Sequence, residues 1–403
     1  MIQAKHNRAV ITGMGVLAAN GTGIDAFWES LVAGRSGIGP ITLFDASDLA
    51  CRIAGEVKDF DPELYVDPAL KPRRMARATQ LGVAASRLAV AHAGLDEQVW
   101  RAGQEVNVVM GVSTSAMDLF AVAPRIHTAV SSVPHAVTSA IAYTYGLTTR
   151  LQTISNGCAS SLDAVAAAAE LVRTGRADMV IAGGADAALT HYVLDGMLKC
   201  RRCSTRNDDP QHASRPFDRN RDYGVLGEGA GVVIVEHRAH AKARGATIYA
   251  EIGGYGTSGD LPHGAEGSGF ALAMAAAVDN DGMYRTDIEH INAHGPSDIS
   301  MDATESDMIK RVFGAHAYQI PVVSIKGVTG CPMGVGGVHQ VIAGALTLHT
   351  GLIPPTANYE VPDPACDLDF VPGQGRKVQL RNVLINTHGF GRGNSSLILK
   401  SAS

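Results

Sequence analysis

Short apolar runs alternate with stretches of small, helix-forming residues along the whole chain. The strand-like runs are RAVITGMG, VNVVMGVS, ADMVIAGGA, VVSIKG and NVLINTHG. Strands that alternate with helical stretches are typical of parallel sheets with crossover helices. The pattern therefore predicts an α/β protein.

A repeat organises this pattern. Residues 151–175 and 322–351 each run from a strand through a Gly-Cys turn into a helix of small residues, and each ends in Thr-Gly. Gly175 and Gly351 stand where a helix C-terminal glycine is favoured. We expect a duplicated α/β unit with two close central helices and with the Gly-Cys turns facing each other; a chance likeness between two Ala-rich helices is the alternative. No linker divides the chain, so we place the two halves at 1–255 and 256–403.

Composition excludes several classes of protein. The 403 residues are 46% hydrophobic and 18% charged, as in a well-buried α/β protein, and the net charge of −5 argues against nucleic-acid binding. No apolar segment reaches the roughly 18 residues of a membrane span, and the N-terminus does not read as a signal peptide, so we expect a cytoplasmic protein. Six scattered cysteines are no disulfide framework. Cys200-x-x-Cys203 lacks a second ligand pair, so we expect no metal site.

Cys158 is the candidate nucleophile. It lies between the strand-like LQTIS and a helix that starts near Ala159. The partial positive charge of a helix N-terminus favours a thiolate, and the N–H groups of such a turn can stabilise an oxyanion. The alternative is a buried structural cysteine.

Candidate helper groups lie in the second half. His294 follows a strand-like run and precedes a Gly-Pro break, so a loop would carry its imidazole into a cleft; a structural histidine is the alternative. Lys326 ends the strand VVSIK, and Glu305 is a plausible partner for its charge. Asp302 and Glu305 share a helix face, and we expect at least one of them to be solvated.

Two loops complete the pattern. The glycine-rich turn at 386–394 can bring N–H groups against a ligand, with Phe390 as a movable plug. The charged stretch at 218–231 reads as a buried loop of structural ion pairs.

Together these segments resemble the elongating β-ketoacyl-ACP synthases, or ketosynthases, over essentially the entire chain. The matching segments are GCASSLDAV, FDRNRDYGVLGEGAG, NAHG with the later DATE, SIKGVTG and GFGRGN. The resemblance implies the thiolase fold, a five-layered αβαβα duplication, and a dimer.

The resemblance also implies a reaction. An acyl group passes from acyl carrier protein to the nucleophilic cysteine, and an enolate from decarboxylated malonyl-ACP then attacks that thioester. Substrates are carried on phosphopantetheine, and no cofactor is bound permanently. The implied site residues are Cys158 as nucleophile, Phe390, Gly389 and Gly391 at the oxyanion hole and gate, His294 for decarboxylation, and Lys326 with Glu305 in a charge network.

The sequence departs from the family at its second catalytic histidine, which is Cys331 here. A thiol donates hydrogen bonds poorly, and loss of one oxyanion donor can cost roughly 3 kcal/mol. His339 lies eight residues further along, rotated about 80° and more than two turns away, so we do not expect it to substitute. If the repeat makes Cys158 and Cys331 equivalent, their sulfurs should nearly touch and could form a reducible pair.

The motifs around the pantetheine also differ. The family's H-G-T-x-T, whose threonines bond the pantetheine arm, is here residues 294–298. Pro296 cannot donate, which leaves Ser297 and Asp298 as the contacts, and Asp298 brings negative charge to the tunnel. Gly-Gly-Thr after the gating Phe has become Gly-Arg-Gly (391–393), and Thr-Ala before the nucleophile has become Asn-Gly (156–157).

The stretch LKPRRMAR is a cationic patch on an acidic protein. Lys71, Arg73 and Arg74 would steer an acidic carrier protein, as the equivalent segment of the family does; an ordinary solvated helix start is the alternative.

We interpret the chain as an acyl-thioester condensing enzyme of specialised polyketide or fatty-acid biosynthesis. Two alternatives stay open. The first is a non-decarboxylating acyltransferase or cyclising ketosynthase variant, which the missing histidine favours. The second is a non-catalytic subunit like a chain-length factor, against which Cys158 weighs. The partner is either a second copy of the chain or a second ketosynthase-like subunit.

Overall fold

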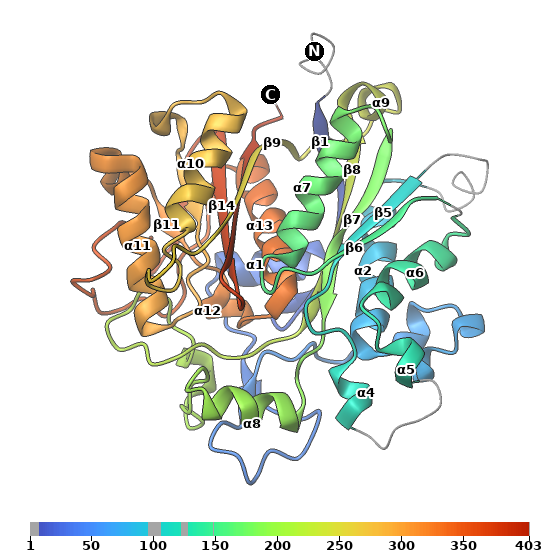
Figure 1. Cartoon of the computed structure of the whole chain (residues 1–403), viewed down its shortest axis with the longest axis horizontal. Helices are drawn as coiled ribbons and strands as arrows, with labels where there is room; N and C mark the ends of the chain where they lie inside the picture. Colours follow the sequence, from blue (N-terminus) through green and yellow to red (C-terminus); the bar gives the residue numbers. More distant parts are fainter. Residues whose placement is uncertain (1–7, 96–105, 122–127, 148, 403) are drawn as a thin grey trace.

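Two groups of strands form one large mixed sheet (Figure 1). The computed structural model describes residues 8–95, 106–121, 128–147 and 149–402. The first group contains β1 (Ala9–Ala18), β5 (Val106–Gly111), β6 (Leu151–Ile154), β7 (Met179–Asp186) and β8 (Gly229–His237). The second contains β9 (Ala250–Gly259), β10 (His290–Asn292), β11 (Val322–Val323), β14 (Asn382–Gly389) and β15 (Gly393–Lys400). Three short pairs add β2 (Gly21–Thr22) beside β1, β3 (Gly39–Pro40) with β4 (Ile53–Ala54), and β12 (Leu352–Ile353) with β13 (Arg376–Lys377).

The two groups have the same topology. From the centre outward the orders are β1-β8-β7-β5-β6 and β9-β15-β14-β10-β11. In each group the three outer strands are parallel and the two inner strands are antiparallel to their neighbours. β1 and β9 join the groups through Val10–Glu251 and Ile11–Ala250. The predicted duplication is confirmed, and the predicted boundary between residues 255 and 256 falls inside β9.

Helices cover both faces of each group of strands. The α-helices are α1 (Ile24–Val32), α2 (Arg77–His92), α4 (Met117–Ala121), α5 (Thr128–Ser131), α6 (His135–Thr144), α7 (Ser160–Arg173), α8 (His191–Lys199), α9 (Arg238–Ala243), α10 (Phe270–Asp281), α11 (Ile299–Phe313), α12 (Lys326–Thr329) and α13 (Gly336–Thr350). α2 packs on one outer face and α10 on the other, while α7 and α13 lie between the two groups of strands (Figure 1). These are the five αβαβα layers that the sequence predicts.

The central helices α7 and α13 are the two copies of the repeat. Each follows the edge strand of its group, β6 or β11. A Cβ on Gly337 would lie 2.7 Å from both Cβ and N of Leu162, so the helices approach too closely for a larger residue. Gly175 (φ 69°) and Gly351 (φ 68°) follow the helices in the left-handed conformation. Small residues thus allow the helix contact that brings the two Gly-Cys turns together.

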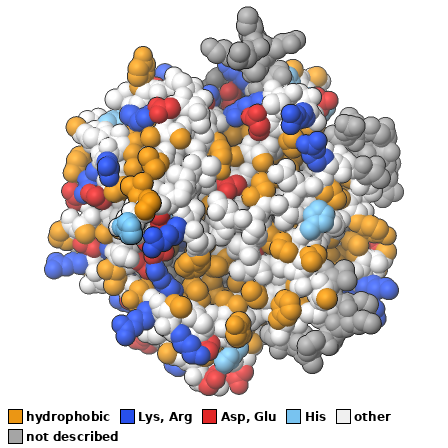
Figure 2. Space-filling model, in the orientation of Figure 1, with side chains coloured by type: hydrophobic (Ala, Val, Ile, Leu, Met, Phe, Trp, Pro, Cys, Tyr) orange, Lys and Arg blue, Asp and Glu red, His pale blue; other side chains and the backbone are white. Residues whose placement is uncertain are grey.

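The outer surface is mixed. Figure 2 shows Lys, Arg, Asp and Glu side chains interspersed on one face, with hydrophobic side chains gathered below its centre. Within the described ranges, none of the helices has both the length and the apolar character needed to cross a bilayer.

Candidate active site

Cys158 lies in the sharp turn between β6 and α7, and its side chain is 4% exposed. Gly157 adopts φ +53°, and a Cβ there would lie 2.8 Å from the carbonyl oxygen of Phe390. A Cβ on Gly389 would lie 3.0 Å from the backbone N of Cys158. Both glycines are therefore needed where the nucleophile turn packs against the end of β14.

This packing places two backbone donors beside the thiol. The N–H groups of Cys158 and Phe390 have no hydrogen-bond acceptor in the part of the chain that the structure describes. Free N–H groups next to a thiol can stabilise the oxyanion of an acyl-transfer intermediate. Gly391 (φ 100°) and Arg392 (φ 70°) form the following turn.

The thiols of Cys158 and Cys331 lie close enough to shift each other's pKa, and both are free cysteines. The backbone N–H of Cys331 donates to Val225 O at 2.8 Å, so its turn is held by the neighbouring loop. A short 3₁₀ helix, Met333–Val335, separates Cys331 from α13, whereas Cys158 lies directly before α7. The second turn is therefore longer than the first.

The two neighbouring thiols shift each other's pKa in opposite directions. The hydrogen bond from Cys158 lowers the pKa of Cys331, with a further contribution from nearby Lys326, and outweighs the effect of burial. Contact with Cys331 and burial raise the pKa of Cys158. The pair therefore loses its first proton more readily than an isolated thiol and its second much less readily.

His294 follows β10, is 4% exposed, and has its tautomer fixed by two donors. Lys326 Nζ lies 3.1 Å from His294 Nδ1, and Lys326 also donates to the carbonyl oxygen of His294. The backbone N–H of His388 donates to the same Nδ1 at 3.3 Å. Nδ1 must accept, so the ring hydrogen is on Nε2. Burial, Lys326 and His388 lower the pKa of His294 well below its usual value, so the ring is a neutral donor.

The predicted pair of Lys326 with Glu305 is wrong. Glu305 accepts from the backbone N–H groups of His294 at 2.9 Å and Gly295 at 2.8 Å, and from Asn386 Nδ2 at 3.2 Å. Among the described residues no ion pair joins Glu305 to Lys326, which begins α12 rather than ending a strand and binds His294 instead. The two charges lie close enough to interact, but Glu305 acts by holding the loop that carries His294.

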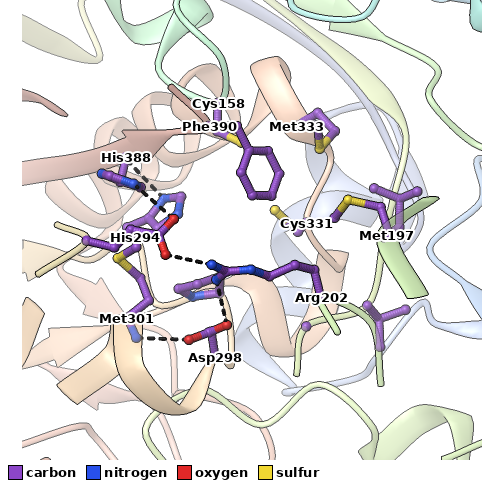
Figure 3. Close-up of a pocket in the computed structure, with 15 residues that line it drawn as sticks. Cys158, Met197, Arg202, His294, Asp298, Met301, Cys331, Met333, His388 and Phe390 are labelled. Carbon is purple, nitrogen blue, oxygen red and sulfur yellow. Dashed lines mark hydrogen bonds and ion pairs between the residues drawn. The ribbon is translucent and has the colours of Figure 1, made fainter. Parts of the chain in front are cut away.

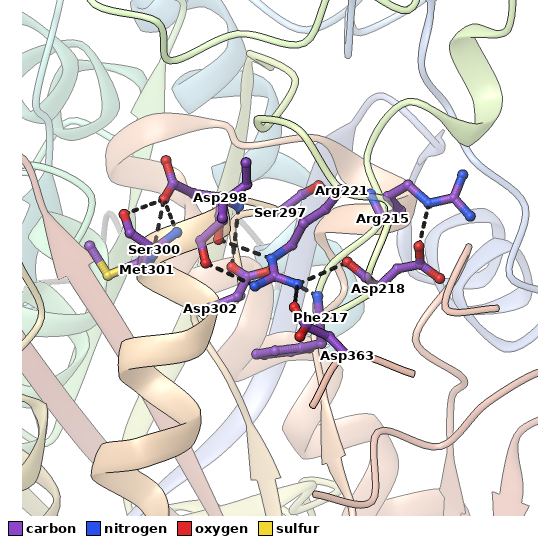
Figure 4. A network of polar contacts seen from close by, with 12 residues as sticks. Arg215, Phe217, Asp218, Arg221, Ser297, Asp298, Ser300, Met301, Asp302 and Asp363 are labelled. Carbon is purple, nitrogen blue, oxygen red and sulfur yellow. Dashed lines mark hydrogen bonds and ion pairs between the residues drawn. The ribbon is translucent and has the colours of Figure 1, made fainter. Parts of the chain in front are cut away.

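The expected solvated face on α11 is also wrong. Asp302 and Glu305 are both 0% exposed. Asp302 accepts from the backbone N–H of Phe217 at 2.8 Å and lies 3.4 Å from Arg221. The charged stretch at 218–231 meets this helix in the interior, and Arg221 also contacts Asp363 at 2.5 Å (Figure 4). The network fixes α11 and the loop that precedes it.

Ser297 and Asp298 do not have the predicted surroundings. Ser297 is 0% exposed, and its hydroxyl accepts from Arg215 N at 2.9 Å, so it lies away from the pocket. Asp298 does line the pocket, but Arg202 neutralises its charge at 3.1 Å. Asp298 also caps α11 by accepting from the N–H groups of Ser300 and Met301, both at 3.0 Å.

Cys158, Cys331, His294 and Phe390 line one pocket (Figure 3). Its free volume is about 60 Å³, and the Phe390 ring points into it although the residue is 46% exposed. The other lining residues are Met197, Arg202, Gly224, Val225, Leu226, Glu266, Pro296, Asp298, Met301, Met333 and His388. His339 lies elsewhere: it is buried on α13 with Nε2 3.1 Å from Ala230 O.

Sequence reasoning missed His388, Arg202 and Glu266. His388 stands near the end of β14, two residues before Phe390, and this closeness to the gating residue could have indicated it. Arg202 donates to Glu266 at 2.7 Å from loops 64 residues apart, a pairing that no local pattern reveals.

The cationic patch lies at the surface, next to the 3₁₀ helix Pro72–Arg74. Lys71, Arg73 and Arg74 line a hollow together with Glu63, which pairs with Arg73 at 2.7 Å. Within the described residues, no carboxylate lies within ion-pair distance of Lys71 or Arg74. Two of the three cations are therefore free to meet a partner.

Comparison with known proteins agrees with this geometry. The family models "Beta-ketoacyl synthase, N-terminal domain" and "Beta-ketoacyl synthase, C-terminal domain" match residues 6–241 and 249–360. The chain is 40% identical to "Putative polyketide beta-ketoacyl synthase 1" of Streptomyces cyaneus, covering 97% of both chains. It is 38% identical to "3-oxoacyl-[acyl-carrier-protein] synthase 2" of Coxiella burnetii, covering 98% of this chain and 99% of the relative.

Solved structures show the same likeness. The ishigamide ketosynthase/chain length factor superposes with a TM-score of 0.90 at 32% identity, covering 99% of this chain and 100% of that one. A type II polyketide synthase acyl-carrier protein in complex with its ketosynthase matches with a TM-score of 0.88 at 29% identity, covering 98% and 100%. The family models and the full-length relatives show that the chain belongs to the β-ketoacyl synthase family and has its thiolase fold.

Proposed function

We propose that this protein forms a carbon–carbon bond between an acyl group carried by Cys158 and a malonyl-derived enolate, in polyketide or fatty-acid biosynthesis. The observation that carries the proposal is the convergence on one pocket of a helix-terminal thiol, two free N–H groups and the Nε2–H of neutral His294. This set provides a nucleophile, an oxyanion hole and a donor to a second thioester carbonyl.

Acyl loading is a transthioesterification. The Cys158 sulfur bonds to the acyl carbonyl carbon, the bond from that carbon to the carrier's sulfur breaks, and the thiol proton passes to the departing sulfur. The N–H groups of Cys158 and Phe390 hold the oxyanion that forms between these steps. Because the pocket has only about 60 Å³ free, the Phe390 ring moves aside to admit the acyl chain.

Condensation begins when the malonyl carboxylate leaves as CO₂. The electron pair of the broken bond moves onto the thioester, and the enolate oxygen accepts from His294 Nε2–H. The enolate carbon then attacks the acyl carbonyl, a carbon–carbon bond forms, and Cys158 leaves as thiolate. Lys326 keeps His294 neutral and oriented throughout, because its ammonium donates to Nδ1.

The substrates reach the pocket on the phosphopantetheine of an acyl carrier protein. The patch of Lys71, Arg73 and Arg74 supplies the positive charge that an acidic carrier needs. A relative of this chain is a ketosynthase paired with a chain length factor, so we propose a dimer with a second chain of the same fold.

Reconstitution tests the proposal. The protein is mixed with an acyl-carrier donor and malonyl-carrier, and Cys158 acylation, CO₂ release and β-ketoacyl product are measured together, with Cys158→Ala as the control. We expect all three from the wild-type protein and none from the variant. Acylation without CO₂ would select a non-decarboxylating transferase, and neither event would select a chain-length-factor-like subunit.

A further inference from the structure

The pocket contains a second imidazole, that of His388 at the end of β14. The residue is 3% exposed and its ring centroid lies 6.0 Å from that of His294, with the rings at 69° (Figure 3). Phe270 packs beside both rings, at 6.2 Å from His294 and 5.7 Å from His388. Two imidazoles therefore share one water-poor wall of the site.

A chain of hydrogen bonds fixes the proton on Nδ1 of His388. Asp260 accepts from the N–H groups of Gly267 at 3.0 Å and Gly269 at 3.1 Å, and from Asn394 Nδ2 at 2.9 Å. A carboxylate accepts only, so the Asn394 amide must turn its nitrogen toward Asp260. Its Oδ1 then faces His388 Nδ1 at 2.9 Å and accepts from it.

The other nitrogen of His388, Nε2, faces a carboxylate but makes no hydrogen bond to it. Nε2 lies 3.6 Å from Glu266 Oε1, and it is buried without a hydrogen-bond partner in the described part of the chain. Arg202 holds Glu266 from its other oxygen at 2.7 Å. A lone pair on Nε2 would face negative charge, so a hydrogen on Nε2 is the favourable state.

The surroundings of His388 therefore favour its imidazolium form. Burial lowers its pKa, but Glu266, Asn394 and Asp260 outweigh this effect and raise it above the usual value. The opposite shift at His294, which faces Lys326 and His388, keeps that ring neutral. Environments that shift the pKa values of two neighbouring groups in opposite directions are typical of paired catalytic roles.

Resting on the proposed function, we propose that His388 is a second catalytic imidazole, whose Nε2–H donates to the enolate oxygen held by His294. The electron pair released with CO₂ collects on that oxygen, where a charged donor stabilises it more than the thiol of Cys331 does. His388 stays protonated; as the enolate carbon attacks, the carbonyl re-forms and the hydrogen bond weakens.

Matched substitutions separate this role from a structural one. His388→Gln keeps a neutral N–H near the Nε2 position, whereas His388→Asn retains a polar group only near Nδ1. Each variant is first acylated, and the single-turnover reaction with malonyl-carrier is then followed. We expect His388→Asn to slow condensation about 100-fold and His388→Gln about 10-fold, while acylation of Cys158 changes less than about twofold. The melting temperatures check that the variants fold.

The pH dependence gives a second readout. The wild-type condensation rate falls as the pH rises through the raised His388 pKa, and His388→Gln lacks that limb. Nitrogen-15 NMR of labelled histidines should also show an imidazolium that persists to a higher pH than a free imidazole and that His388→Gln removes; this measurement needs no turnover.

Condensation at the wild-type rate in His388→Asn, equal slowing of acylation and condensation, or no such imidazolium signal would overturn the role of His388. If Cys158 of the wild-type protein is never acylated, the proposed function is overturned instead. The NMR measurement would still report on the charge of His388.

Discussion

The Lys326 ammonium lies 3.1 Å from Nδ1 of His294 and so determines which imidazole nitrogen carries the hydrogen. Lys326 is 2% exposed, and a buried cation seldom persists without such an acceptor. The loop that carries His294 is held in turn by Glu305. Charge, tautomer and ring orientation are therefore linked across three segments of the second half.

Replacing Lys326 with methionine should disable decarboxylation more than acylation. Methionine has a similar length but cannot donate, so His294 loses the charged one of the two donors that fix its tautomer. We expect CO₂ release from malonyl-carrier to fall about 100-fold, with Cys158 still acylated. Equal loss of both steps, measured side by side, would show that Lys326 acts on the thiol pair instead.

The buried network around Arg221 should govern stability. Arg221→Met leaves the buried Asp302 carboxyl and its neighbour Asp363 without their cation, so we expect the free energy of unfolding to fall by about 3–5 kcal/mol. The matched control is Lys199→Met, which removes an exposed pair with Asp195 and should leave the free energy of unfolding nearly unchanged. Chemical denaturation of both variants measures the difference; similar small losses would mean that the network does not support the fold.

The contact between Cys158 and Cys331 should make the protein sensitive to oxidants. A mild disulfide oxidant accepts two electrons from the thiols, which release two protons; an S–S bond forms and the intact mass falls by about 2 Da. Oxidant treatment should stop acylation of the wild-type protein, and reduction should restore it. Under the same treatment, Cys331→Ser should lose only part of its acylation activity. Two thiols that stay freely labelled throughout the oxidant treatment would exclude the redox pair.

Carrier docking should depend on the two unpaired cations of the surface patch. Lys71→Glu with Arg74→Glu reverses two charges, and we expect the association rate with carrier protein to fall about tenfold at low salt and less at high salt. Lys377→Glu, at an exposed position on β13, is the control for net charge. An unchanged association rate in the double variant at low salt would remove the patch from the docking surface.

The repeat and the strand pattern predict the fold because both can be read from short, continuous stretches of the sequence. Two Gly-Cys turns before small-residue helices imply two equivalent units, and the two groups of strands do have the same order in the sheet. The site is less predictable, since partners come from distant loops: Lys326 binds His294 rather than Glu305, and Arg202 reaches Asp298 across 96 residues. Whether a side chain such as that of Ser297 is buried depends on residues that are distant in the sequence, and the spacing of a motif does not identify them.

The central claim is that Cys158 takes an acyl group from a carrier. The direct measurement is intact-mass analysis followed by peptide mapping, after incubation of wild-type protein and of Cys158→Ala with an acyl-carrier donor. We predict one acyl group, on the peptide that contains Cys158, and none on the variant. An unmodified Cys158, or equal acylation of the variant, would contradict the account.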